Sequence, residues 1–325
     1  MRVNVLHHAA CFDGVSSCAL FTAFFERCVS ADARLSYFAK QHRRGDPYAD
    51  GDFDADQAAV LDFRYTMRDG LTWFFDHHQS AFQLPGEREH FDADRSGKKF
   101  YDPTAPSCTG YIAKIASEQF GFDVSPHTEL LHWAQMVDSA DFPDPQMPVE
   151  LAVPPLRLMT FAEQALRDPD TIAQFVRDLI TRPLKDIAEA QYVVDALAPA
   201  LARHAEDIQL IKSRLSLDAG VLQYMLLDQP PRAYNKFIPY YHHPKARYLV
   251  GVSIGPEGKI KLSAGYNPWL PPAEREHDLS ALCERFGGGG HPYVGGITFD
   301  ADREQQAIAA HAWIVDVLRG HRAPS

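Results

Sequence analysis

Hydrophobic and polar positions in the first half of the chain form two alternating kinds of segment. Short apolar runs of strand length are followed by longer segments in which apolar residues recur at helical spacing. We predict strands at 3–6, 58–61 and 71–75, helices at 15–28, 107–120 and 129–139, and a long polar loop at 82–106. Strands that alternate with helices in this way are typical of βαβ units around a parallel sheet.

The second half of the chain has a different pattern. Residues 161–217 look mostly helical, and 184–215 is predicted to form one long helix or a helix pair, kinked at Pro199. Beyond residue 216, β-rich runs at 220–228, 246–255 and 259–267 are separated by Pro and Gly. Because 325 residues exceed what one hydrophobic core usually organises, we expect an α/β fold with several parts. These are an N-terminal parallel-sheet domain at 1–183, a helical linker at 184–216 and a smaller mixed α/β domain at 217–325.

Residues able to bind cations or phosphate follow each of the three predicted strands. The set is His7, His8 and Asp13 after the first strand, Asp62 after the second, and Asp76, His77 and His78 after the third. Because the carboxyl ends of parallel strands lie along one edge of a sheet, we expect these side chains to converge. A turn or a helix cap explains one strand-terminal Asp, but three such strand ends together favour a binding site.

Asp138 is a fourth candidate, on the helix predicted at 129–139. It lies seven residues after Leu131 and four after Ala134, which places it on the apolar face of that helix. A carboxylate on such a face costs free energy to bury unless it is paired or bound to a metal. Asp141, three residues on, is either a second inward carboxylate or an exposed residue.

Carboxylates and imidazoles together suit Mn²⁺, Zn²⁺ or Fe better than a site for Mg²⁺ alone, because imidazole prefers the softer ions. Two metals roughly 3.5–4 Å apart can activate water and stabilise the oxygens of an in-line phosphoryl displacement. The cluster therefore predicts metal-dependent hydrolysis of a phosphoester.

Four segments carry a resemblance to a known family. "HHAACFDG", "LDF", "FDHHQS" and "MVDSADF" occur in the order of the four motifs of the DHH phosphoesterases, and "FGGGGHPYVGGITF" (286–299) is similar to the glycine-rich histidine motif of the DHH-associated C-terminal domain. That superfamily includes nano-RNases (oligoribonucleases), single-strand exonucleases, nucleotide phosphatases, cyclic-dinucleotide phosphodiesterases and pyrophosphatases. The resemblance implies a hydrolase that uses two metals, usually Mn²⁺, with its active site in a cleft between the two domains.

The resemblance also implies a role for each motif residue. Asp62 would bridge the two metals, Asp13, His77 and Asp138 would complete one, and His8 or its neighbour His7, with position 11, would serve the other. Asp76 would orient His77, and His78 would contact the scissile phosphate. Only one of His7 and His8 can face the metals, because successive residues of a strand point to opposite sides.

Cys11 departs from the family pattern, which commonly has Asp at this position. A thiolate ligand favours Zn²⁺ or Fe over Mn²⁺. Two alternatives stay open: a weak metal site with fewer protein ligands, and a small buried thiol that only lies beside the site. In a second departure, Gly265 and Tyr266 lie where related C-terminal domains often carry a phosphate-binding arginine.

The glycine-rich segment is the second candidate for substrate binding. Gly288, Gly289 and Gly290 allow backbone N–H groups to approach an anion closely, and His291 adds a donor. We therefore predict phosphate or nucleotide binding there. The basic residues Lys98 and Lys99, in the predicted loop, are further candidates, although each alone is better explained as a solvated surface charge.

Composition and charge limit the classes of partner that we expect this protein to bind. The formal net charge of −11 disfavours extended, sequence-independent binding to nucleic acid, which depends on phosphate contacts, and leaves a short anionic substrate open. The five cysteines are an odd number and are scattered along the chain, which argues for reduced thiols. No apolar stretch has the length of about 20 residues that a membrane span needs. We expect a cytoplasmic protein with no membrane partner; its oligomeric state stays open, with a homodimer as one alternative.

These observations together predict a metal-dependent phosphodiesterase that acts on short single-stranded oligonucleotides or small nucleotides. The first alternative is a catalytically weak nucleotide-binding or regulatory protein whose metal site is altered by Cys11. The second is a polyphosphate or pyrophosphate hydrolase, which shares the chemistry and differs in what occupies the substrate end.

Overall fold

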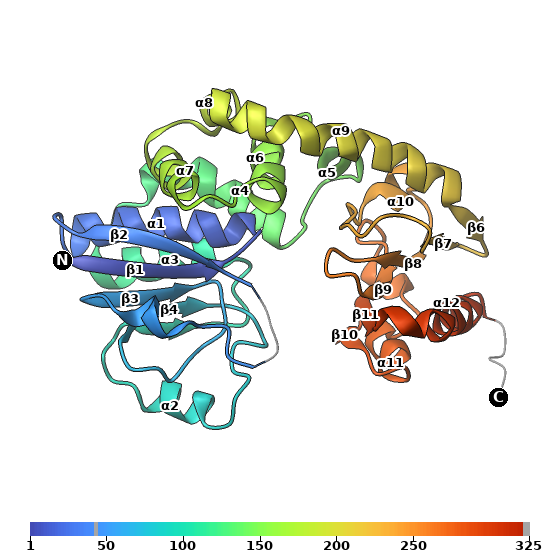
Figure 1. Ribbon diagram of the computed structural model, residues 1–325, viewed down its shortest axis with the longest axis horizontal. Helices are drawn as coiled ribbons and strands as arrows, with labels where there is room; N and C mark the ends of the chain where they lie inside the picture. The colour runs from blue at the N-terminus through green and yellow to red at the C-terminus, as the bar shows by residue number, and fades with distance from the viewer. Residues whose placement is uncertain (42–44, 321–325) are drawn as a thin grey trace. The chain divides into compact units, whose positions relative to one another are not determined.

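The computed structural model describes residues 1–41 and 45–320. Within this range the chain forms two compact units (Figure 1). Unit 1 comprises Met1–Phe142 and Leu151–Ala200, and unit 2 comprises Pro143–Glu150 and the described part of Leu201–Ser325. The division after Ala200 falls inside one long helix, between the predicted boundaries at 183 and 216.

Unit 1 is built on a five-stranded sheet in the order β2-β1-β3-β4-β5, with every neighbouring pair parallel. Its strands are β1 (Arg2–His8), β2 (Arg34–Lys40), β3 (Gln57–Leu61), β4 (Leu71–Asp76) and β5 (Lys99–Tyr101). Its helices are α1 (Phe12–Cys28), α2 (Glu87–Ala93), α3 (Cys108–Phe120), α4 (Thr128–Asp138), α6 (Pro154–Gln164), α7 (Pro169–Thr181) and α8 (Leu184–Ala188), with short 3₁₀ turns η1 (Asp50–Phe53) and η2 (Ser125–His127). The predicted parallel α/β class is confirmed.

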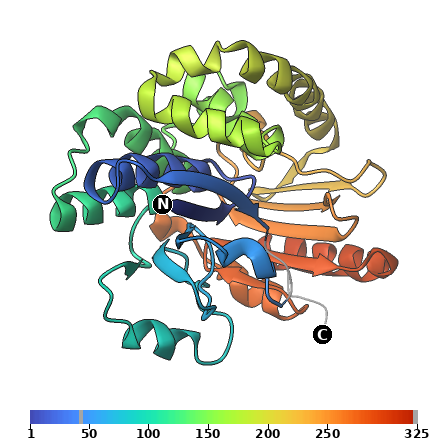
Figure 2. The same cartoon turned by 60° about the vertical axis from the view of Figure 1, so that its left-hand side comes forward.

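Strand alternation explains how both faces of this sheet are covered. On β4, Trp73 and Phe75 point to the face where α1 and α3 supply Phe21 and Phe120. Phe74, between them, points to the opposite face, where it meets Phe91 of α2. Figures 1 and 2 show α1 along one face of the strands and α2 on the other side. A central strand buried on both faces reads as a continuous apolar run, which is why residues 71–75 were recognisable from sequence.

Two predictions for unit 1 need correction. The predicted loop at 82–106 contains α2 and β5, and the edge strand β2 had no predicted counterpart. Strand β5 has only three residues and starts at a lysine, and β2 has a mostly exposed pattern, so neither shows the hydrophobic periodicity of a strand. Both are strands because of their pairing with β4 and β1, which is a long-range property.

Helix α9 (Gln191–Arg214) follows α8 after a break of two residues, so the predicted long helical segment is a helix pair. Pro199 lies inside α9 rather than at its end. Among the described residues, no helix has both the length and the apolar character needed to cross a membrane.

Unit 2 contains a six-stranded mixed sheet in the order β10-β11-β9-β8-β7-β6, in which only β7 and β8 pair in parallel. Its strands are β6 (Ser216–Asp218), β7 (Val221–Leu226), β8 (Tyr248–Ile254), β9 (Ile260–Tyr266), β10 (Gly289–His291) and β11 (Val294–Phe299). Its further helices are α5 (Gln146–Glu150), α10 (Ile238–His242), α11 (Leu279–Glu284) and α12 (Glu304–Leu318), with η3 (Pro272–Glu274) and η4 (Ala301–Arg303). The predicted second, mixed α/β part is confirmed.

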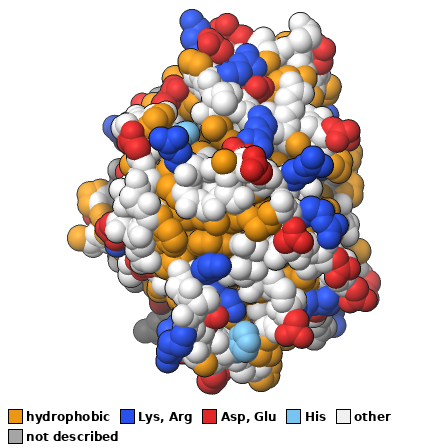
Figure 3. Space-filling view, turned by 90° about the vertical axis from the view of Figure 1, so that its left-hand side faces the viewer, with side chains coloured by type: hydrophobic (Ala, Val, Ile, Leu, Met, Phe, Trp, Pro, Cys, Tyr) orange, Lys and Arg blue, Asp and Glu red, His pale blue; other side chains and the backbone are white. Residues whose placement is uncertain are grey.

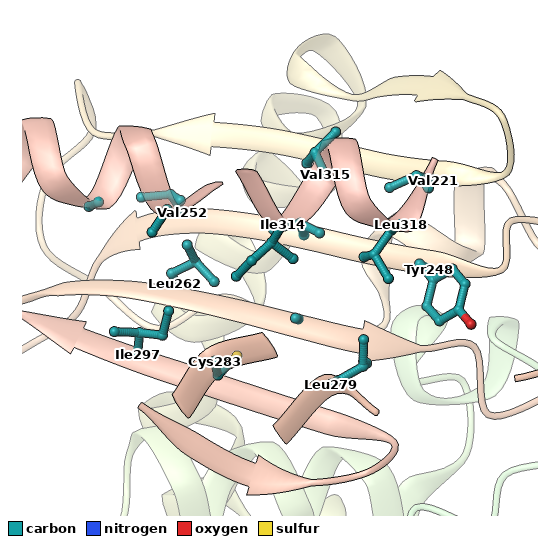
Figure 4. Close-up of a cluster of buried hydrophobic side chains, with 14 of the residues drawn as sticks. Val221, Tyr248, Val252, Leu262, Leu279, Cys283, Ile297, Ile314, Val315 and Leu318 are labelled. Atoms are coloured by element: carbon teal, nitrogen blue, oxygen red, sulfur yellow. The ribbon is translucent and has the colours of Figure 1, made fainter. Parts of the chain in front are cut away.

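The core of unit 2 lies between its sheet and helices α11 and α12 (Figure 4). Ile314 and Leu318 of α12 and Cys283 of α11 are buried against inward-facing strand residues such as Leu262 and Ile297. Burying each large apolar side chain stabilises the fold by about 1.5–3 kcal/mol. This unit therefore has a core of its own.

Candidate metal centre

The candidate site lies at the carboxyl edge of the sheet in unit 1. His8 ends β1, Asp62 follows β3, and Asp76 ends β4. The parallel register sets His7 beside Leu61, so the next residues, His8 and Asp62, emerge at the same level. The strand order reverses direction at the β1/β3 pair, the place where open α/β sheets bind ligands.

Asp62 is the centre of the cluster. Its side chain is fully buried, and its backbone has a φ of 54°, in the left-handed region. A non-glycine residue in this region stores backbone strain, which is typical of functional sites. Its Oδ1 lies 3.5 Å from Nε2 of His77, and its Oδ2 lies 3.6 Å from Nδ1 of His8. The two oxygens of one carboxylate therefore face two different imidazoles.

The first ligand group consists of Asp13, His77 and Asp138, whose ligand atoms lie within 4.8 Å of one another. Nε2 of His77 is 3.3 Å from Asp138 Oδ2 and 3.9 Å from Asp13 Oδ2. Nδ1 of His77 lies 2.9 Å from the carbonyl oxygen of Ala105. Because a carbonyl only accepts, Nδ1 must carry a proton, and in the neutral ring the lone pair of Nε2 is directed to the carboxylates.

The second ligand group consists of His8, Cys11 and Asp62, again within 4.8 Å. Cys11 is the N-cap of α1: its Sγ accepts from the N–H of Gly14 at 3.4 Å and lies 3.5 Å from Asp62 Oδ2. Burial raises the pKa of the Cys11 thiol well above its ordinary value, and the charge of Asp62 adds to this. The sulfur of Cys11 therefore lies among the ligand atoms, and the thiol keeps its proton as long as no cation is bound nearby.

The electrostatics of this cluster favour a bound cation. Burial and the charge of Asp62 raise the pKa of Asp13 well above its ordinary value and that of Asp138 to about 6. Burial opposes ionisation of Asp62 too, but its contacts with His77 and His8 hold its pKa below the ordinary range. Burial alone would lower the pKa of His77, yet Asp62 and Asp13 raise it to about 10. Carboxylates crowded in this way repel one another, and a cation bound among them would relieve that repulsion.

Buried polar atoms without hydrogen-bond partners also favour a bound cation. Asp62 Oδ1 and His77 Nε2 are buried and have no hydrogen-bond partner among the described residues. Leaving such atoms without a partner costs about 1–3 kcal/mol each. Oxygen, nitrogen and sulfur donors at this spacing fit a divalent cation of the Mn²⁺, Zn²⁺ or Fe class. The donor set therefore fits the metals expected from the sequence.

Asp76 and His78 are arranged differently from the role implied by the family resemblance. Asp76 Oδ1 accepts from Nδ1 of His78 at 2.7 Å and from its backbone N–H at 3.3 Å. The partner of His77 is the carbonyl of Ala105, so Asp76 orients His78 rather than His77. The His78 side chain is 34% exposed, against 11% for His77, so it is the more accessible of the two.

His7 is placed away from the ligand groups. Its side chain is buried, and its Nδ1 lies 3.0 Å from the carbonyl oxygen of His8. Burial lowers the pKa of His7 to about 4. A third ligand group consists of Asp62, His77 and His78. None of the three groups found among the described residues contains His7, whereas His8 belongs to one. Strand alternation allows only one of the pair to face this edge, and the tertiary structure selects His8.

Asp13 has a second partner that sequence reasoning missed. Its Oδ2 accepts from the backbone N–H of Cys108 at 2.7 Å, and its Oδ1 accepts from that of Thr109 at 3.1 Å. These are the first N–H groups of α3, which otherwise lack intrahelical partners. The helix end therefore fixes the Asp13 carboxylate, although no local sequence signal links residues so far apart.

Gly14 is required for the approach of α1 to β1. A Cβ at this position would lie 2.5 Å from the carbonyl oxygen of His8. We therefore expect Gly14→Ala to lower the free energy of unfolding by about 1–3 kcal/mol, because the backbone of β1 must move. Urea unfolding measures this, with Gly51→Ala, where the nearest atom is 3.9 Å away, as the control. Equal stability of the two variants would contradict this close approach.

The predicted glycine-rich segment belongs to unit 2, where Gly289 and Gly290 pair with β11 in a short hairpin that ends at the exposed His291. Gly290 has a φ of 148°, and a Cβ there would lie 2.2 Å from the carbonyl oxygen of Val294. Gly288 is equally close, at 2.2 Å, to the carbonyl oxygen of Gly296, while Gly289 has open space around its Cα. Hairpin packing therefore accounts for two of these glycines, and phosphate binding by the segment stays a prediction.

Lysines 98 and 99 already have partners. Nζ of Lys98 lies over the ring of Trp73, and Nζ of Lys99 is 3.1 Å from an oxygen of Asp94. On the face shown in Figure 3, basic side chains are scattered among acidic and hydrophobic ones. That face, as far as its residues are described, offers no continuous basic surface for a long nucleic acid.

No protein-family profile matches the sequence, and no curated protein matches it in sequence. Solved structures do match. The pGpG-specific phosphodiesterase PggH of Vibrio cholerae aligns over 98% of this chain and 99% of its own, with a TM-score of 0.68 and 14% identity. The DHH domain of a protein assigned to a family of ribosomal proteins aligns over 96% and 85%, with a TM-score of 0.60 and 13% identity.

A third match, RecJ of Thermus thermophilus in complex with Mn²⁺, covers 99% of this chain but 53% of its own length, with a TM-score of 0.51 and 14% identity. At these identities the matches establish the fold. The predicted resemblance to the DHH phosphoesterases is thereby confirmed at the level of the fold, including the C-terminal unit.

Proposed function

Because the chain shares its fold with DHH-domain phosphodiesterases, we propose that it is a metal-dependent phosphodiesterase for short single-stranded oligonucleotides or small nucleotides. One observation carries the proposal. Asp62 belongs to one ligand group with His8 and Cys11 and to another with His77 and His78, and His77 is in turn a member of the group with Asp13 and Asp138. With this arrangement Asp62 would help to hold cations in two neighbouring positions, with Mn²⁺ as the expected ion and Zn²⁺, Fe or Mg²⁺ as alternatives.

When bound, a pair of divalent cations supplies Lewis-acid activation of water and of a phosphoryl oxygen. The protein's own residues then have three tasks. Asp13, Asp62 and Asp138 provide the negative charge that holds the cations, and the Ala105 carbonyl keeps the Nε2 lone pair of His77 directed to them. The backbone amides of α3 hold Asp13 in place.

His78 is the residue we assign to the substrate phosphate. Asp76 fixes its ring through Nδ1, which leaves Nε2 as the remaining polar atom of the ring. Its side chain is more exposed than those of His8, His77, Asp13, Asp62 and Asp138, so a ligand reaches it first. A ring oriented in this way donates to a phosphoryl oxygen without losing rotational freedom on binding.

The expected substrates are small. The net charge of −11 opposes long polyanions. The match extends over nearly all of PggH, named as specific for pGpG, and over only about half of the RecJ of Thermus thermophilus. A substrate the size of a dinucleotide is therefore favoured over a long single strand.

A panel assay tests this function. Linear dinucleotides, cyclic dinucleotides, 3′-phosphoadenosine 5′-phosphate and polyphosphate are each incubated with Mn²⁺, Zn²⁺ or Mg²⁺, and the products are resolved by chromatography. We expect mononucleotides from linear dinucleotides, with Mn²⁺ supporting the highest rate. Cleavage of polyphosphate alone would replace the proposal with the polyphosphatase alternative.

Cys11 favours one second candidate, a catalytically weak nucleotide-binding protein. Its protonated thiol is a poor ligand for a hard cation, so one of the two ion positions is weakened if the sulfur stays neutral. This candidate predicts nucleotide binding without turnover of any panel member, and one bound ion per chain instead of two.

A further inference from the structure

Arg64 is a mostly buried cation with no ion-pair partner among the described residues. Its side chain is 4% exposed, and its Nε is buried with no hydrogen-bond partner. No carboxylate of the described residues lies within ion-pair distance of its guanidinium. Arg68, four residues later, shows the contrast: it donates to Asp46 and Asp50 and to two backbone carbonyls.

The carboxylates in this region are already engaged. Tyr48 lies near these carboxylates and near Arg64. Burial raises the pKa of the Tyr48 hydroxyl well above its ordinary value, and the charge of Arg64 lowers it. The charges of Asp76, Asp46 and Glu87 raise it further. All four charges therefore act on one hydroxyl, and that hydroxyl donates to the backbone carbonyl oxygen of Arg64.

Each of these three carboxylates has another partner. Asp46 accepts from the guanidinium of Arg68, and Asp76 accepts from His78. Glu87 accepts from the backbone N–H groups of Gln83 and Leu84 at 2.7 and 2.9 Å. Arg64 is thus a mostly buried side chain that has no counter-ion of its own in the part of the chain that the structure describes.

The backbone of Arg64 lies next to the candidate metal centre. It is two residues after Asp62, in a segment that is tied at both ends to the segment carrying His77 and His78. The backbone N–H of Asp62 donates to the carbonyl of Phe75 at 2.9 Å, and that of Tyr65 donates to the carbonyl of Ala81 at 2.8 Å. Between these two bonds, Arg64 runs alongside the loop that holds the two histidines.

Removing an Arg from water without an anionic partner is costly, and several kcal/mol is the typical order of magnitude. A planar guanidinium with five donors matches the oxygens of a phosphate group. We infer that Arg64 binds a phosphate group of the ligand received by the neighbouring carboxylate–imidazole cluster. This inference rests on the proposed function for the nature of the ligand, and it assigns a phosphate-binding residue from the N-terminal unit.

The inference is tested by binding rather than turnover. Adenosine 5′-monophosphate and adenosine are titrated into the full chain by calorimetry, once with Mn²⁺ and once with EDTA. We expect the parent to prefer the monophosphate and Arg64→Gln to bind it roughly 10- to 100-fold more weakly, the usual effect of losing charge-assisted bonds. Affinity for adenosine should not change, and Arg64→Lys should be intermediate because it keeps the charge without the planar fork.

Arg68→Gln is the matched control. It removes an arginine of the same segment whose donors are already used within the protein, so it should reduce stability and leave the preference for the monophosphate intact. If Arg64→Gln does not fold, the Nε–H signal of Arg64 in the ¹⁵N-arginine spectrum of the parent replaces it. That signal should shift with adenosine 5′-monophosphate and not with adenosine.

The inference is overturned by unchanged monophosphate affinity in Arg64→Gln, by an unmoved Nε–H signal, or by a parent that does not distinguish the two ligands. Failure of the proposed function has a different signature. In that case no member of the substrate panel is hydrolysed, while the binding preference and its loss in Arg64→Gln are still observed.

Discussion

Asp62→Asn should abolish metal-dependent hydrolysis and lower the affinity for Mn²⁺ by more than about 100-fold, since changes to residues that merely support metal ligands already cost 10–100-fold. The substitution keeps the size of the side chain but removes the charge that faces both His77 and His8. The group with His8 and Cys11 loses one of its members, and the group of Asp13, His77 and Asp138 loses the carboxylate that lies 3.5 Å from its histidine, so neither ion position survives intact. Mass spectrometry of the metal content and the Mn²⁺-induced shift of the melting temperature measure this directly.

Asp54→Asn is the control for this prediction. It makes the same change at an exposed carboxylate at the other end of β3. The control should keep full activity and metal content, and the circular dichroism spectra of both variants should match that of the parent. Metal content and hydrolysis that persist in Asp62→Asn would rule out the shared carboxylate as the organising group.

The second large effect is expected at Cys11. Because its sulfur lies with His8 and Asp62, we expect Cys11→Ala to lose the Zn²⁺ bound at this group and to keep the ion held by Asp13, His77 and Asp138. The bound Zn²⁺ should fall from two to one per chain after dialysis. Replacing a soft sulfur by carboxylate oxygen in Cys11→Asp should reverse the preference and favour Mn²⁺ over Zn²⁺.

Stability provides a second measurement of the same change. An aspartate is a better N-cap than cysteine, which would stabilise α1 by about 0.5–2 kcal/mol. Yet the new charge lies beside Asp62 and near Asp13 and Asp138, so Cys11→Asp should melt at a lower temperature than the parent in EDTA and gain more from added Mn²⁺. Cys28→Ala, at the exposed end of the same helix, is the control. Unchanged Zn²⁺ content in Cys11→Ala would mean that the thiol only lies beside the site.

Much of the site could be predicted from local sequence. The strands before His8, Asp62 and Asp76 are buried on both faces, and their apolar runs end at the polar residues that form the site. Helical spacing likewise placed Asp138 at the end of the helix that brings it to His77. These are short-range patterns, since periodicity and the identity of the next side chain suffice to recognise them.

Long-range contacts decided the rest. The partner of Asp76 is His78, and the Asp13 carboxylate is held by the amides of α3, which are more than ninety residues away in the chain. The strands β2 and β5 exist because of their pairing and have little pattern of their own. Propensity cannot predict such features, because their energy comes from neighbours that only the fold supplies.

The sequence by itself determined the class of the fold, the four segments that meet at the sheet edge and the chemical type of their ligand atoms, because each follows from residue identity and spacing. Tertiary structure alone decided that His8 rather than His7 faces Asp62 and that Cys11 lies within the ligand group. It also decided that Arg64 is buried with no counter-ion among the residues described. The reason is physical: which face a side chain takes, and whether its charge finds a partner, depend on strand register and on burial by distant segments.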